Sequence, residues 1–148
     1  MPTAESTALH TDICSPVATT PTWSHLDDDT KDRLMEHGVP LWHDLIRYLR
    51  PHVIVISVAK KLLSRIEFSL SRDWEVIHTV THKTDGTERA QPYPVMARWH
   101  DIGGQSALLV YGRAAQTPFG TVTHHDKYAI GEVANTYRDL SPPAPAPD

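Results

Sequence analysis

The segment from Gly112 to Gly120 carries polar side chains that are well placed to do chemistry. It follows an apolar run, Ala107 to Tyr111, that is typical of a buried strand, and it precedes a helix predicted over residues 127–138. In open α/β sheets, ligands bind at the carboxyl ends of the strands. Hydrogen-bond donors in this segment could reach a phosphate or the edge of a base. They are Arg113, Gln116 and Thr117. The alternative is an ordinary connection between a strand and a helix.

Histidines offer a second kind of chemistry, because the chain has ten of them. His78 and His82 share one face of a predicted strand, and further side chains could complete a metal site with nitrogen and oxygen ligands. These are His100, Asp101, His124, His125 and Asp126. No HExxH or comparable spacing supports such a site, and ten histidines make chance pairings common. We therefore predict neither a metal nor a cofactor.

Other motifs of nucleotide-binding and hydrolytic proteins are missing. The sequence contains neither a phosphate-binding loop nor a dinucleotide fingerprint. Ser57 and Ser106 lack the G-x-S-x-G pattern of a nucleophile elbow. Cys14 is the only cysteine, which excludes a disulfide within one chain. Trp23, in a Pro-rich stretch, could stack on a base or cover the core, and covering the core is the favoured interpretation.

Composition indicates a globular protein. The 148 residues are 40% hydrophobic and 22% charged, and the net charge is −4. That charge argues against nucleic-acid binding by bulk attraction but leaves room for a local basic cleft. The apolar run from Val53 to Ile56 is too short to cross a membrane, and no secretion signal is evident. We expect a cytoplasmic protein without a membrane partner.

Two helices are predicted before the first strand. The first runs from about Asp27 to His37, with Ser24 as its cap and Gly38 as the residue that ends it. The second starts at Pro40 and ends before Pro51, and its apolar residues recur at helical spacing. Trp42 on this helix and Trp99 are expected in the core.

The strands predict an α/β fold. The run from Val53 to Val58 suits a central strand of a parallel sheet, covered on both faces, and a short helix follows over residues 59–66. Residues 74–81 and 93–99 alternate like a hairpin around Asp85-Gly86, with a polar tip from Lys83 to Pro92. We expect a central, mostly parallel sheet flanked by helices, with this antiparallel hairpin added.

One domain is expected from residue 8 to residue 140. Residues 1–7 are predicted to be a flexible leader, and the Pro-rich residues 141–148 a disordered tail.

The order of these parts carries a resemblance. A strand ending in Thr11-Asp12 precedes a Pro-rich loop over residues 15–22, and a helix ending in Leu49-Arg50-Pro51 leads directly into the strand at Val53. The last strand then enters a loop and a terminal helix. Across residues 8–140 this order resembles the later portion of the uracil-DNA glycosylase superfamily, as an order of elements and without a motif-for-motif match.

The resemblance implies an enzyme that flips a damaged base out of DNA and hydrolyses its N-glycosidic bond. Asp12 stands where such proteins usually have an Asn that contacts the base edge. An ionised Asp only accepts hydrogen bonds, so it would suit an exocyclic amino group better than uracil. The usual histidine of the last loop is absent; Arg113 or Gln116 would replace it, with His124 just beyond, while Thr117 and Trp23 would contact the substrate.

Other features depart from the family pattern. The early glycine-containing motif that positions the water is missing, the single Cys14 excludes the cysteine cluster of some branches, and the hairpin is an addition.

The leading hypothesis is a glycosylase-like protein that engages DNA and possesses or has lost excision activity. The alternative is a non-catalytic interaction protein with a degenerate or truncated glycosylase fold. A histidine-based metal hydrolase is a third hypothesis, which bound metal would favour.

Overall fold

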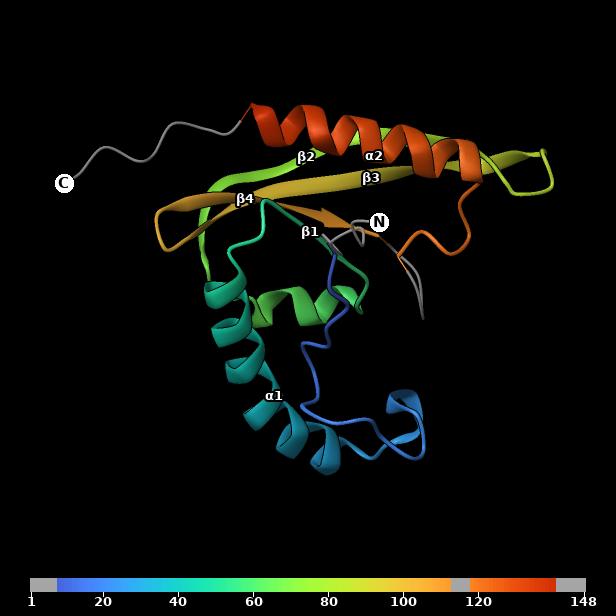
Figure 1. Cartoon of the computed structure of the whole chain (residues 1–148). Helices are drawn as coiled ribbons and strands as arrows, with labels where there is room; N and C mark the ends of the chain where they lie inside the picture. Colours follow the sequence, from blue (N-terminus) through green and yellow to red (C-terminus); the bar gives the residue numbers. More distant parts are fainter. Residues whose placement is uncertain (1–7, 113–117, 141–148) are drawn as a thin grey trace, which may run out of the picture. The chain divides into compact units, whose positions relative to one another are not determined.

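The computed structural model describes residues 8–112 and 118–140. The chain forms two compact units, Met1–Tyr48 and Leu49–Asp148 (Figure 1). The first unit contains a loop, a short 3₁₀ helix η1 (Trp23–His25) and nearly all of helix α1 (Asp28–Leu49). The second contains a four-stranded sheet, the 3₁₀ helix η2 (Lys60–Arg65) and helix α2 (His124–Asp139). The predicted leader and tail lie outside the described residues.

Helix α1 is one continuous helix, so the prediction of two helices was wrong. It begins after Asp27, whose carboxylate accepts a 2.8 Å hydrogen bond from the backbone N–H of Thr30 and a second from its hydroxyl. Asp27 is therefore the cap that the sequence analysis assigned to Ser24. These hydrogen bonds hold the pKa of Asp27 below its ordinary value.

Gly38 lies inside α1, and a glycine is needed there because another part of unit 1 comes very close to the helix. A Cβ at this position would lie 2.7 Å from the carbonyl oxygen of Cys14. Gly38, Trp42 and Ile46 are buried at a spacing of four residues, so one apolar stripe continues along the helix. Burial of this stripe outweighs the one backbone hydrogen bond that Pro40 cannot donate. Gly38 therefore does not end a helix and Pro40 does not begin one, although the local sequence indicated both.

The expected strand before Asp12 is also absent. Residues 8–22 contain bends and no strand. The Asp12 carboxylate accepts a 2.8 Å hydrogen bond from the backbone N–H of Cys14, which turns the chain at this point. Ile13, Cys14 and Ser15 are buried behind the turn.

The sheet is mixed, and most of its pairings are antiparallel. Its strand order is β1-β4-β3-β2, with β1 at Val53–Ile56, β4 at Gln105–Tyr111, β3 at Glu88–Ile102 and β2 at Ser69–His82. Among the described strands, β1 and β4 are the one pair that runs parallel. The α/β class is thus correct, but the expectation of a mostly parallel sheet was wrong, because the predicted hairpin is part of the sheet itself and lies beside β4.

Strand β1 differs from its prediction in position. We expected it to be central and covered on both faces, yet it is an edge strand, and Val55 is 48% exposed. Strand β4 is the buried strand that its sequence predicted, since Ala107 to Val110 have no exposed surface, and it lies between β1 and β3. The β-branched residues of β1 favour a strand, but they do not indicate how many strands lie beside it.

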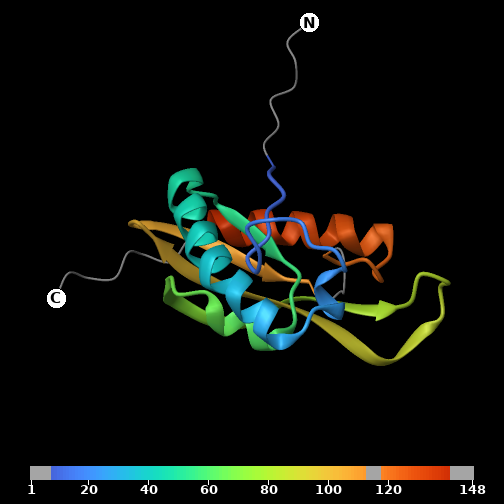
Figure 2. The same cartoon turned by 90° about the horizontal axis from the view of Figure 1, so that it is seen from below.

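The hairpin and the terminal helix agree with the sequence analysis. Asp85 and Gly86 lie in the β2–β3 turn, which is shorter than expected because β3 already begins at Glu88. The tip extends beyond the other strands (Figures 1 and 2). Ile130 and Ala134 of α2 are buried against a core that includes Trp99. Trp42 and Trp99, 4% and 1% exposed, are the core residues that we predicted. Among the helices that the structure describes, none combines the length and apolar character needed to span a membrane.

Candidate functional site

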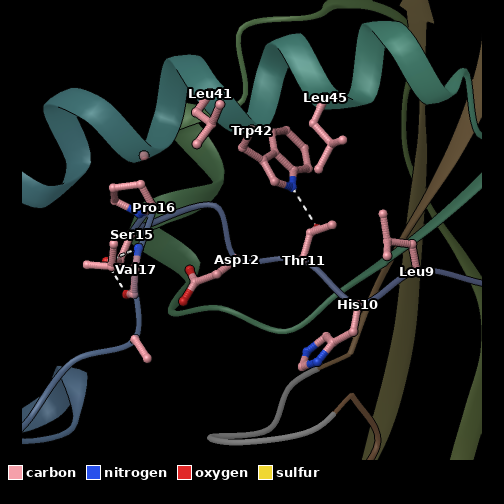
Figure 3. A pocket seen from close by; sticks show the side chains of 12 residues that line it. Leu9, His10, Thr11, Asp12, Ser15, Pro16, Val17, Leu41, Trp42 and Leu45 are labelled. Carbon is pink, nitrogen blue, oxygen red and sulfur yellow. Dashed lines mark hydrogen bonds between the residues drawn. The ribbon is translucent and has the colours of Figure 1, made fainter.

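A cavity of about 480 Å³ lies within unit 1, between the loop of residues 9–18 and helix α1 (Figure 3). The helix contributes an apolar wall through Leu41, Trp42 and Leu45, whose side chains point toward the loop. The loop contributes both apolar and polar side chains. They are Leu9, His10, Thr11, Asp12, Ser15, Pro16, Val17 and Ala18. The size is typical of sites that bind small molecules.

Hydrogen bonds within the loop fix its shape. Besides the bond from Cys14 to Asp12, the Ser15 hydroxyl donates to the carbonyl of Val17 at 2.7 Å and accepts from its N–H at 3.3 Å. The loop rests on the helix backbone at Gly38. Only a residue without a side chain allows this close approach. The pocket is therefore formed by short-range turns that are held against one helix.

Trp42 connects the two walls of the pocket. Its indole Nε1–H donates a 3.1 Å hydrogen bond to the hydroxyl of Thr11 (Figure 3). The ring also meets His43 edge-on, with centroids 5.2 Å apart, and Nδ1 of His43 donates to the carbonyl of Val39. Trp42 is part of the wall, but because it is nearly fully buried it offers little surface on which a ring could stack.

Asp12 is the sequence-predicted site residue that the structure places at this pocket. Its side chain is exposed at the rim, and Oδ1 is engaged by the Cys14 amide. Within residues 8–112 and 118–140, Oδ2 has no hydrogen-bond partner. His10 is the other ionisable residue of the lining, and it is also exposed. The pocket thus combines an acceptor and an imidazole with an apolar wall.

The other expected site residues are not brought to this pocket. Trp23 is half-buried in η1 of the same unit but does not line the cavity. His124 is exposed on the first turn of α2 in unit 2. Arg113, Gln116 and Thr117 lie outside the described residues. The residues that flank them meet closely, because a Cβ on Gly112 would lie 3.1 Å from the Cβ of Pro118.

A histidine–aspartate pair lies in unit 2. Nε2 of His78 on β2 lies 3.0 Å from Oδ1 of Asp126 on α2. Oδ2 of Asp126 accepts from the hydroxyl of Thr123, which in turn accepts from the Asp126 N–H. Ile77 is the additional residue of a β-bulge, and the bulge turns His78 toward α2. The hydrogen bond from His78, followed by that from Thr123, lowers the pKa of Asp126.

Sequence reasoning weighed these two side chains as metal ligands, and the structure pairs them with each other. In the part of the chain that the structure describes, no three His, Cys, Asp or Glu side chains are arranged to hold a metal ion. Sequence reasoning also did not identify Thr11 as the partner of Trp42, because the two residues are 31 positions apart. The only local signal at the pocket was the turn-forming sequence that surrounds Asp12 and Pro16.

The chain was compared with protein-family models, with curated proteins and with solved structures, and none of the three comparisons gave a match.

Proposed function

We propose that the protein engages DNA by taking a base, turned out of its stack, into the pocket of unit 1. The proposal depends on Asp12, an exposed carboxylate at the rim of a pocket with an apolar wall. One carboxylate oxygen is held by the Cys14 amide, and the other has no hydrogen-bond partner among the described residues. A base has apolar faces, which suit the apolar wall from α1, and polar edges, which suit the polar side chains of the loop. The resemblance to the uracil-DNA glycosylase superfamily, which also points to Asp12, supports the proposal.

The charge of Asp12 sets the expected preference. An ionised carboxylate only accepts hydrogen bonds, so Oδ2 favours a base edge that carries an amino group. Adenine and cytosine have such a group, whereas uracil and hypoxanthine have a carbonyl oxygen in its place. The preferred base of this pocket is therefore an amino-bearing one.

Base excision would require more from the same residues. Hydrolysis of an N-glycosidic bond needs a positioned water and stabilisation of the departing base. Oδ2 of Asp12 can hold a water or contact the base edge, but not both at once. His10, the other ionisable residue of the lining, would then have to take the second role. The geometry thus favours base recognition, and excision is the further step that an assay must test.

The test of recognition uses single-stranded oligonucleotides that differ at one base. Binding is measured by fluorescence anisotropy for cytosine, adenine, uracil and hypoxanthine at the variable position. Asp12→Asn keeps an oxygen for the Cys14 amide and presents an amino donor in place of Oδ2. We expect the preference to shift by about tenfold toward the carbonyl-bearing bases, because one good pairing discriminates by about 1–3 kcal/mol. Asp32→Asn, an exposed acid of α1 outside the pocket, is the matched control.

An equal response of the two variants would contradict the proposal. Excision is tested separately, by incubating the same oligonucleotides with a chelator and scoring abasic sites after alkali. Abasic product that disappears in Asp12→Ala and His10→Ala supports hydrolysis. Arg113→Ala tests the expected contribution of the loop after β4. Binding without product supports the alternative, a non-catalytic protein that has kept the recognition pocket.

A further inference from the structure

Arg98 and His100 of β3 lie on the face of the sheet opposite α2. Their neighbours Ala97 and Trp99 belong to the core under α2, and successive side chains of a strand point to opposite faces. The chain between β1 and β2 covers this second face. Nη2 of Arg98 donates to the carbonyl of Leu63 at 3.3 Å, and Nδ1 of His100 donates to the carbonyl of Phe68 at 2.9 Å.

Arg98 is a half-buried cation without a matching anion. Among the residues with described positions, no carboxylate lies within ion-pair distance of it, and its buried Nε has no hydrogen-bond partner. Burial lowers the pKa of Arg98, and the more distant Asp73 opposes this effect only in part. A charge removed from water without a partner is costly, so an anion that reached it would be strongly favoured.

Aromatic rings hold the guanidinium in place. The central carbon of the Arg98 guanidinium lies 4.5 Å from the ring centroid of Trp74. Trp74 is tilted against Tyr111 at 6.3 Å, and the hydroxyl of Tyr111 donates to the carbonyl of Val58. Arg98 is therefore positioned in advance by a stacked ring and loses little freedom on binding a ligand.

His100 adds an acceptor on the same face. Its side chain is 3% exposed, and because Nδ1 carries the proton that is donated to Phe68, Nε2 carries a lone pair. Nε2 has no hydrogen-bond partner within the described ranges. Burial is the main cause that lowers the pKa of His100, which keeps the ring neutral. The pair thus places donors at Arg98 and one unpartnered acceptor at His100 beneath the chain between β1 and β2.

We propose that this face of the sheet, under the chain between β1 and β2, binds a phosphate group that carries a hydroxyl, either free phosphate or the monoanion of a phosphate monoester. Its anionic oxygens would accept from Arg98, and its P–OH would donate to Nε2 of His100. Residues i and i+2 of a strand are about 6.6 Å apart, which one tetrahedral group with two hydrogen bonds can span. Exposed cations on η2 would attract the anion. They are Lys60, Lys61 and Arg65.

The site is independent of the pocket in unit 1, because none of its residues lines that pocket. Asp12 variants that lose base recognition should therefore still bind phosphate at Arg98 and His100. Likewise, if phosphate does not bind there, the proposal of base recognition is unaffected. The two possible sources of the group, free phosphate and the phosphorylated end of a nucleic acid, share the same chemistry and can be separated by the choice of ligand.

The test is an NMR titration of the whole protein that follows the Arg98 Nε–H and the His100 ring nitrogens. Phosphate and sulfate are added separately. Both are tetrahedral anions, but only phosphate keeps a hydroxyl at neutral pH. We expect saturable shifts of both residues with phosphate, and about tenfold weaker binding of sulfate, since it has no proton for Nε2. Equal binding of the two anions, or no saturable shift at millimolar phosphate, would overturn the proposal.

Variants and longer ligands complete the test. Arg98→Met removes the charge with a similar volume and should weaken phosphate binding at least about tenfold. Arg72→Gln removes an exposed cation of β2 that is already paired with Glu75, and it should change little. Equal losses in the two variants would show attraction by bulk charge only and would reject the site.

Oligonucleotides with a 5′-phosphate or a 5′-hydroxyl identify the source, since only the first should compete with free phosphate if the ligand is a nucleic-acid end. If Arg98→Met does not fold, the comparison of phosphate with sulfate on the unaltered protein still decides.

Discussion

The carboxylate of Asp126 on α2 accepts a 3.0 Å hydrogen bond from His78 on β2, and this bond joins the terminal helix to the hairpin of unit 2. The same carboxylate accepts from Thr123, the residue that caps α2. One side chain thus stabilises the start of a helix and attaches that helix to the sheet. Both hydrogen bonds are stronger to the ionised form of Asp126.

Acid should therefore weaken unit 2 through Asp126. The pKa of this carboxyl is lowered in the folded state, mainly by the hydrogen bond from His78, so folding favours the ionised form. The resulting stabilisation is fully present above the ordinary pKa of about 3.9 and is lost as the pH falls through the lower, folded value. Urea unfolding at a series of acidic pH values should show this loss in the wild type and a weaker dependence in Asp126→Asn.

Asp126→Asn should also destabilise the protein by about 1–2 kcal/mol at neutral pH, because hydrogen bonds to a charged group are lost. Asp139→Asn is the control, since Asp139 is an exposed acid at the end of the same helix. An acid dependence that is identical in wild type and Asp126→Asn would show that other carboxylates cause it.

Two glycines in helices should respond to alanine with opposite signs. Gly38→Ala places a Cβ within 2.7 Å of the Cys14 carbonyl, so the loop or α1 has to shift, at a cost of about 1–3 kcal/mol. A Cβ on Gly131 of α2 would meet no atom within 4 Å, so alanine there should stabilise by about 0.5–1 kcal/mol. Thermal unfolding of both variants measures the difference. Stabilisation by Gly38→Ala would contradict the close approach.

The hydrogen bond between Trp42 and Thr11 should couple the two walls of the pocket. Thr11→Val keeps the shape of the side chain but removes the acceptor for the indole N–H, which is expected to cost about 1 kcal/mol. Trp42→Phe removes the donor, and a double-mutant cycle should give a coupling free energy of the same order. The cycle is measured by urea unfolding. Additive effects of the two substitutions would show that the bond contributes nothing.

Local sequence signals predicted the elements whose structure depends on local interactions. The apolar residues of α2 recur at helical spacing, and Asp85-Gly86 marks a turn whatever surrounds it. Gly38 and Pro40 were misinterpreted because tertiary contact with the loop and the buried stripe of α1 override the usual meaning of these residues. Strand β1 was placed in the centre of the sheet because its composition reports propensity and not the number of its neighbours.

The candidate sites show the same division. Asp12 was singled out from the order of elements, and the pocket around it needs the approach of α1, which no local pattern encodes. Arg98 was missed altogether. Alternation along β3 indicates only which face it lies on, whereas its missing anion and its covering segment are properties of the folded chain.

The sheet ends in two strands of very different length, and this difference bears on aggregation. An outer strand with open backbone groups can act as a template for other chains. Strand β1 has the most β-prone sequence of the protein, but its four residues offer only a short register to an incoming segment. Strand β2 is long, yet four register irregularities interrupt its pairing with β3 and disturb the straight row of groups that stacking requires. The edge at β1 is thus protected from fibre-like growth because the strand is short, and the edge at β2 because its pairing is irregular.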